Sequence, residues 1–396
     1  MRRILFVLAA LLSCRIVSAQ MYVAPRKGVE SSVFLEKEGM TAAQQGLEMW
    51  GRYIFSLENR GHVNVYDFRT ASSKPVADFN LASYRKDNHA NGASFGIETK
   101  KGASFPLLYI TNGKPGSEIE WTCFVESITR RGKRFTSTIA QEIVLDTTGW
   151  SGCGYAAIFG SPCWMVDRER GFLWVFSASR RTVAKYTRYF WENKYIATKF
   201  RVPALSEGAK VTLGVNDILD QVIFPYEVWF TQSGCIHDGK IYYCFGVGKQ
   251  DDNRPSRIRI YDTDTRSIIA RYQVQEEIPF EPEDVVVRDG WMYVNTNVNR
   301  KKTGALPCIF KVALPKEAPE PYPAGEWTEN PGGNVQISFL RHEGDTTLLA
   351  KILVEGTKPD LPFACAEGEY YRWADLYSYY FSGRESASSC KQVDRF

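Results

Sequence analysis

The sequence lacks the features of several protein classes. After its first 19 residues no stretch is apolar for long enough to cross a bilayer, so no membrane span is expected. Lys and Arg number 49 against 45 Asp and Glu, a net charge of +4, which argues against the clustered basic surface of a nucleic-acid binder. There is no Gly-rich phosphate loop and no Gly-x-Ser-x-Gly elbow. Nine cysteines include no Cys-x-x-Cys pair, so a zinc site is not expected, and we expect no cofactor.

The N-terminus has the layout of a secretory signal peptide. Arg2 and Arg3 precede an apolar run from Ile4 to Leu12, and small residues end at Ala19. We therefore expect cleavage after residue 19 and export to the periplasm or the extracellular space. The alternative is a lipid anchor at Cys14, which follows Leu11-Leu12-Ser13.

Eight cysteines remain once Cys14 is set aside, and an exported protein permits disulfides among them. A bridge between Cys365 and Cys390 would hold the polar C-terminal tail. Cys235 and Cys244 lie in predicted strands, where a buried free thiol is the commoner state.

A hairpin phrase recurs along the chain and predicts its architecture. Between residues 232 and 243, a β-prone run turns at Asp238-Gly239 and returns, and Asp-Gly between such runs is a strong hairpin signal. The phrase returns at Asp289-Gly290 and, in a looser form, between residues 44 and 54. Aromatic residues make up 14% of the chain, which suits strands.

Six modules of this kind predict an all-β fold, a single β-propeller of six blades, although five or seven also fit. The sixth module would combine Asn334 to Leu340 with Leu348 to Leu353 and lacks a fourth strand. We expect the isolated strand Val33 to Lys37 to supply it and so to close the ring. The predicted domain covers residues 20–384, followed by a C-terminal tail at 385–396.

Two stretches carry a resemblance to known proteins. Pro282 to Val294 and Ile260 to Thr265 resemble the blades of secreted bacterial propellers of the NHL, YncE-like and SMP-30-like type. This resemblance implies a propeller and no particular activity. The sequence offers no set of metal ligands that could be mapped onto a lactonase-like site.

In a propeller the residues just before each innermost strand converge on one face. Aligning the modules on their hairpins predicts ten ligand-binding residues at this mouth, which are Gln44, Gln45, His89, Asn91, Ser161, Gln232, Ser233, Glu283, Asp284 and Asn334. Amides, hydroxyls, acids and an imidazole suit a polyhydroxylated ligand. The competing interpretation is that they only cap strand ends and turns.

Two functions fit these observations. The first is an exported, monomeric propeller that binds a polysaccharide or a cell-envelope protein through its polar channel face. The alternative is a carbohydrate-active enzyme, a glycoside hydrolase or polysaccharide lyase, that uses His89 with Glu283 or Asp284 as acid and base, and Glu281 or Glu227 as a further carboxylate.

Overall fold

The structure, a computed structural model, describes residues 25–26, 28–112, 116–178, 195–224, 231–250, 254–314, 326–332, 335–341, 348–354 and 370–372. It divides into two compact units, and the larger, Pro25–Pro319, contains the propeller. The signal segment 1–19, Asn334, Glu227, Cys365 and Cys390 lie outside the described residues.

The propeller unit consists of five antiparallel sheets, or blades, numbered here in chain order. Blade 1 contains β3 (Gln44–Trp50), β4 (Tyr53–Glu58), β5 (His62–Asp67) and β6 (Ala77–Asn80). Blade 2 contains β7 (Ala90–Phe95), β8 (Leu108–Asn112), β9 (Thr122–Arg131) and β10 (Arg134–Leu145), with β14 (Lys210–Leu213) parallel to β10 at its edge. Blade 3 contains β11 (Phe159–Asp167), β12 (Phe172–Ala178), β13 (Tyr195–Arg201) and β15 (Ile218–Phe224).

The last two blades each receive a strand from the N-terminal segment. Blade 4 contains β16 (Thr231–His237), β17 (Lys240–Phe245), β18 (Arg257–Asp262) and β19 (Ser267–Gln273), with β1 (Pro25–Arg26) parallel to β19. Blade 5 contains β20 (Glu281–Arg288), β21 (Trp291–Asn297), β22 (Cys308–Ala313) and β2 (Ser31–Glu36). The described helices of this unit are short connections: η1 (Ser151–Cys153), η3 (Leu205–Glu207), η4 (Val215–Asp217), η5 (Gly248–Gln250) and α2 (Arg300–Thr303).

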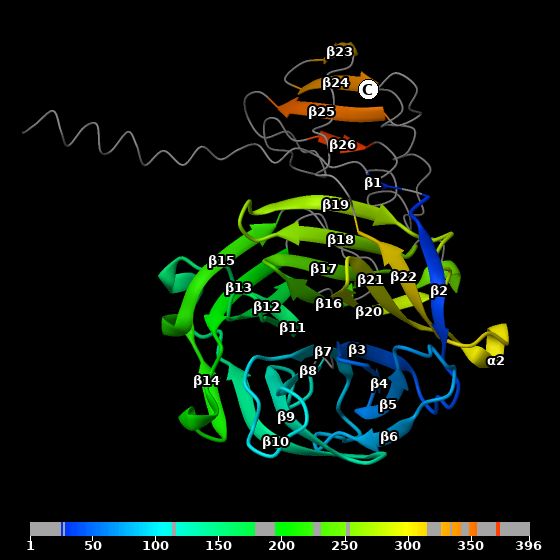
Figure 1. Cartoon of the computed structure of the whole chain (residues 1–396). Coiled ribbons are helices and arrows are strands. Elements are labelled where there is room, and N and C mark those ends of the chain that lie inside the picture. Colours follow the sequence, from blue (N-terminus) through cyan, green and yellow to red (C-terminus); the bar gives the residue numbers. More distant parts are fainter. Residues whose placement is uncertain are drawn as a thin grey trace, which may run out of the picture. The chain divides into compact units, whose positions relative to one another are not determined.

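The first strands of the blades form a ring of five. Strand β3 contacts β7, β7 contacts β11, β11 contacts β16, β16 contacts β20, and β20 contacts β3 again. Figure 1 shows these strands towards the centre of the unit, with β6, β14, β15 and β19 at its periphery. The prediction of a single all-β propeller is therefore confirmed, but the number of blades is five and the prediction of six is wrong.

Direct packing of blade 5 on blade 1 is the physical reason for five. The shared core contains Leu47, Met49 and Ile54 of blade 1 together with Val286 and Tyr293 of blade 5. Since these side chains fill the interface, no sheet can enter between the two blades. The residues expected to form the sixth blade are instead a four-stranded antiparallel sheet of the other unit, in the order β23 (Glu326–Gly332), β24 (Val335–Arg341), β25 (Leu348–Val354), β26 (Tyr370–Arg372).

The N-terminal strand therefore has a different partner from the one expected. Ser31 pairs with Val312 and Glu36 with Cys308, so β2 is the fourth strand of blade 5 and not of a sixth blade. Upstream, Pro25 pairs with Arg271 of blade 4. The segment from Pro25 onwards thus contacts two successive blades.

The Asp-Gly hairpins are confirmed in detail. Asp238 and Gly239 have φ values of 47° and 71°, and Asp289 and Gly290 have 50° and 76°. Positive φ at both central residues is what a two-residue type I′ turn needs, and its twist matches that of the strands. Cys235 and Cys244 are buried free thiols, as expected.

Candidate functional site

Each inner strand is irregular near its start, where the predicted mouth residues lie. The register with the second strand of the blade shifts between Gln44 and Leu47, Ala90 and Gly92, Phe159 and Cys163, Thr231 and Gly234, and Pro282 and Asp284. A bulge re-aims side chains and interrupts backbone pairing. Five bulges at one level of the ring therefore leave a concentration of polar groups there that simple strand alternation does not predict.

At the level of the bulges the inner strands of blades 2 and 4 approach too closely to leave an open channel between them. A Cβ added to Gly92 of blade 2 would lie 2.3 Å from the Oγ of Ser233 of blade 4. Ser233 is fully buried, and its Oγ lies 3.2 Å from the Sγ of Cys163. Ser233, predicted to bind ligand, is thus placed in contact with protein, which favours packing as its role.

The carboxyl of Asp284 connects the inner strands of blades 1, 2 and 5 through hydrogen bonds. Its Oδ2 accepts a hydrogen bond of 2.8 Å from the N–H of Leu47 in blade 1, and its Oδ1 accepts one of 2.9 Å from its neighbour Val285. The N–H of Ala93 in blade 2 also bonds to this carboxyl. Burial raises the pKa of Asp284 well above its ordinary value, whereas the three N–H bonds act in the opposite direction. We assign Asp284 a structural role.

Glu283 and Glu281 form a carboxyl pair at the start of β20. Glu283 is buried, and its pKa is raised well above its ordinary value, first by burial and then by the charge and hydrogen bond of Glu281. A hydrogen bond between two carboxyls requires a proton on one of them, and the raised pKa assigns it to Glu283. Glu281 is half-buried and is the member of the pair nearer to solvent.

A chain of hydrogen bonds links this pair to the neighbouring blades. The Nε2 of Gln232 in blade 4 donates to Glu281 Oε1 at 3.0 Å, and the Nδ2 of Asn297 in blade 5 donates to Glu281 Oε2 at 3.1 Å. The backbone N–H of Gln44 in blade 1 then donates to Asn297 Oδ1 at 3.2 Å. The structure thus brings Gln44, Gln232 and Glu283 together across three blades.

Three further predicted residues carry buried oxygens that the protein leaves unsatisfied. Gln45 Oε1, Asn91 Oδ1 and Ser161 Oγ have no hydrogen-bond partner among the residues that the structure describes. They lie near the starts of the inner strands of blades 1, 2 and 3. Buried polar atoms are normally paired, so these oxygens need water or a ligand.

Lys37 is a member of the site that the sequence alone did not single out. It is fully buried, and its Nζ donates to Gln44 Oε1 at 2.8 Å, to Ser56 Oγ at 3.3 Å and to Asn295 Oδ1. Burial lowers the pKa of its ammonium group from 10.5 to about 7. The sequence placed Lys37 at the end of the expected strand Val33 to Lys37, but its burial between blades 1 and 5 was not visible there.

The pKa of Lys37 predicts a pH dependence of stability. Below pH 7 the amine is charged in both the folded and the unfolded chain, and the fold carries the full cost of burying that charge. As pH rises from about 7 to 10.5 the folded form is already neutral, so the free energy of unfolding should increase by roughly 3–5 kcal/mol. Denaturant titrations across this range, compared with Lys37→Met, isolate the effect. The increase should disappear in Lys37→Met and persist in the exposed control Lys74→Met; an unchanged slope in Lys37→Met would contradict the assignment.

His89 does not join the carboxyls with which it was expected to act. It is half-buried just before β7, and its backbone N–H donates to Asn112 Oδ1 at 3.1 Å. The partners that the structure gives to Glu283 and Asp284 do not include His89. An acid/base pair of His89 with either residue therefore stays a prediction.

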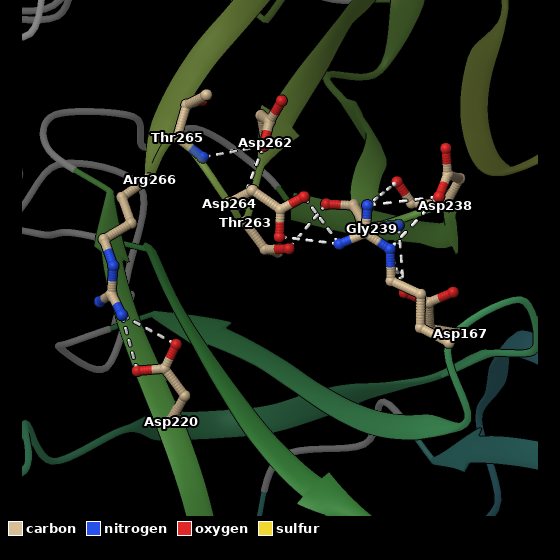
Figure 2. Close-up of polar contacts among 10 residues, drawn as sticks. Asp167, Asp220, Asp238, Gly239, Asp262, Thr263, Asp264, Thr265 and Arg266 are labelled. Atoms are coloured by element: carbon tan, nitrogen blue, oxygen red, sulfur yellow. Dashed lines mark hydrogen bonds and ion pairs between the residues drawn. The ribbon is translucent and has the colours of Figure 1, made fainter.

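The hairpin turns at the other ends of the strands carry an acidic cluster that is already paired. Arg170 of blade 3 bonds to both carboxylate oxygens of Asp264, at 2.7 and 2.8 Å, and to the carbonyl of Asp238. Asp167 accepts the N–H of Gly239 at 3.0 Å, and Figure 2 shows these groups facing one another between the turns. Within the described part of the chain no group of three or more His, Cys, Asp or Glu side chains could hold a metal ion. These hydrogen bonds connect blade 3 to blade 4.

Comparison with known proteins assigns the chain to no family. No protein-family model matches the chain, and no curated protein matches it either. Among solved structures it is similar to a glutaminyl cyclase of Myxococcus xanthus, with 15% identity and a TM-score of 0.40 over 74% of this chain and 98% of that one. A tail fibre of Staphylococcus aureus phage P68 matches at 9% identity and a TM-score of 0.41 over 83% and 75% of the two chains. A glucose dehydrogenase matches at 9% and 0.39 over 72% and 100%. Likeness at this level carries no functional argument, and nothing in it singles out the NHL, YncE-like or SMP-30-like propellers.

No helix of the described residues is long and apolar enough to span a membrane.

Proposed function

We propose that this protein is an exported binding protein whose mouth holds a polyhydroxylated ligand, a segment of glycan, without transforming it. The observation that carries the proposal is the set of buried, unsatisfied oxygens of Gln45, Asn91 and Ser161. Together with the half-buried Gln232 and Glu281, they form a rim of acceptors and donors on all sides of the ring. Sugar hydroxyls both donate and accept, so they can satisfy such a rim. Export rests on the signal-like N-terminus and is part of the proposal.

One observation favours the alternative, a carbohydrate-active enzyme. Burial raises the pKa of Glu283 and so favours its protonated form, and an acid kept protonated by burial is what a general acid needs. The Glu283 carboxyl already has Glu281 as its hydrogen-bond partner, however, whereas the oxygens of Gln45, Asn91 and Ser161 have no partner among the described residues. Binding therefore fits the geometry better than catalysis.

The test screens the purified protein against a polysaccharide panel for both binding and product release. Asn91→Ala and Ser161→Ala should each weaken glycan binding about tenfold, because a lost hydrogen bond of about 1.4 kcal/mol has that effect. His237→Ala, in a hairpin turn of blade 4, is the matched control and should bind as the unaltered protein does.

Three outcomes would overturn this proposal. Release of cleaved sugar that Glu283→Gln abolishes would make the protein an enzyme. Binding of cell-envelope proteins with no glycan bound would show a protein partner. Glycan binding unaffected by both mouth variants would place the site elsewhere.

A further inference from the structure

A separate cleft of about 440 Å³ lies on blade 1. Its walls come from the chain before β3, the β4–β5 turn, β6 and the loop after β6, and its lining residues are Thr41, Ala42, Glu58, Asn59, Arg60, His62, Asp78, Phe79, Asn80 and Tyr84. None of them is a residue of the mouth. Its volume lies at the lower end of the range typical of small-molecule sites.

Part of the lining is held rigidly by the protein itself. Glu58 accepts hydrogen bonds from the N–H of Thr41 at 3.0 Å, from its hydroxyl at 2.6 Å, and from Asn64 Nδ2 at 3.1 Å. The imidazole of His62 lies between Asn80, with Nδ1 at 2.8 Å from Oδ1, and Asp78, with Nε2 at 3.9 Å from Oδ2. These groups fix the shape of the cleft, because their hydrogen-bonding capacity is largely used inside the protein.

Three other groups are open to a ligand. The Oδ1 of Asn59 is buried and has no hydrogen-bond partner among the residues described, so it requires a donor. The guanidinium of Arg60 is exposed and forms no ion pair within the described part of the chain, so it can donate to ligand oxygens. The ring of Tyr84, a residue 43% exposed, offers an apolar face. A ligand that satisfies all three has hydroxyl groups on a ring with an apolar face.

The charges of the lining decide against an anionic ligand. The carboxylates of Glu58 and Asp78 oppose the cations of Arg60 and, when it is protonated, His62. Their sum is one negative charge when His62 is neutral and zero when it is protonated, so an anion gains no net attraction. We infer that this cleft binds a single neutral pyranose sugar, with its ring face on Tyr84 and its hydroxyls on Asn59 and Arg60. The inference does not rest on the function proposed for the mouth.

The test is titration calorimetry of the full chain with methyl glucoside, methyl galactoside and methyl mannoside, and with glucuronate as the charged probe. At least one neutral pyranoside should bind in the millimolar range or tighter, and more tightly than glucuronate. Tyr84→Ala should weaken this binding about tenfold while Tyr84→Phe keeps it, because only the ring face is used. Arg60→Gln should weaken it by a similar factor.

The variant Asn91→Ala separates the two sites, since it alters the mouth and leaves the cleft intact. It should leave pyranoside binding unchanged. Melting temperatures of the Tyr84 and Arg60 variants should match that of the parent, because both side chains are exposed. The inference is overturned by binding of none of the neutral pyranosides, by tighter binding of glucuronate, by equal binding in Tyr84→Ala, or by loss of binding in Asn91→Ala alone.

Discussion

A chain that lacks residues 25–40 is expected not to form the five-bladed ring. The deletion removes β2 from blade 5, the contact of Pro25 with blade 4, and the three side-chain hydrogen bonds of Lys37. It also removes Leu35, which is 2% exposed in the core between blades 1 and 5. Each lost backbone hydrogen bond costs about 1 kcal/mol and Leu35 about 2 kcal/mol. The sum is comparable to the whole stability of an ordinary domain, about 5–15 kcal/mol.

Circular dichroism and denaturant unfolding measure this loss, and two comparisons make it specific. A chain that begins at residue 25 should unfold as the full chain does, and a synthetic peptide of residues 25–40 added to the deleted chain should restore the cooperative transition. Within β2, Leu35→Asp should be severely destabilising, whereas Val33→Asp, at a position 50% exposed, should have little effect. Cooperative unfolding of the deleted chain at the parent's midpoint would show that the segment is dispensable.

Replacement of Asp284 by Ala should also strongly destabilise the folded protein, although only one side chain changes. The backbone N–H groups of Leu47, Ala93 and Val285 would lose their acceptor in the centre of the ring. An unsatisfied buried donor costs about 1–3 kcal/mol, so we expect a loss of roughly 3–6 kcal/mol in the free energy of unfolding.

Denaturant unfolding of Asp284→Ala and Asp284→Asn measures the effect. Asp284→Asn should fall between the parent and the alanine variant, since its amide keeps one acceptor oxygen but turns a donor towards N–H groups. Asp289→Asn, an exposed substitution on the same blade, should change the free energy of unfolding by less than about 0.5 kcal/mol. A fully stable Asp284→Ala would mean that the ring holds its inner strands without this carboxyl.

The hairpins could be predicted because their signals are local, as at Asp238-Gly239. The number of blades could not, because a stand-alone sheet such as β23–β26 has the same strand pattern as a blade. Whether a sheet becomes a blade is decided by packing between residues far apart in the sequence, such as Leu47 and Val286. In blade 3 the chain leaves the sheet after β13, adds β14 to the edge of blade 2, and returns as the fourth strand, β15.

The site was predictable to the same extent. Position within the repeat was enough to place Gln44, Gln232 and Glu283 at one end of the ring. The network that connects them depends on the bulges and on Asn297, which comes from a second strand and not from a strand start. No local signal in the sequence marks a register shift of that kind, and none marks the burial of Lys37.

The pairing of β2 with β22 has a consequence for the order in which the chain can fold. The strand at residues 31–36 is synthesised early, but its partner at 308–313 is made only after four blades. Pairing between segments so distant in sequence is slow, and until it occurs both strands have unpaired edges that favour aggregation. The nascent chain must therefore keep its first strand accessible until nearly the whole propeller has been made. A chain that is exported unfolded meets this requirement, because its ring can be completed after transport.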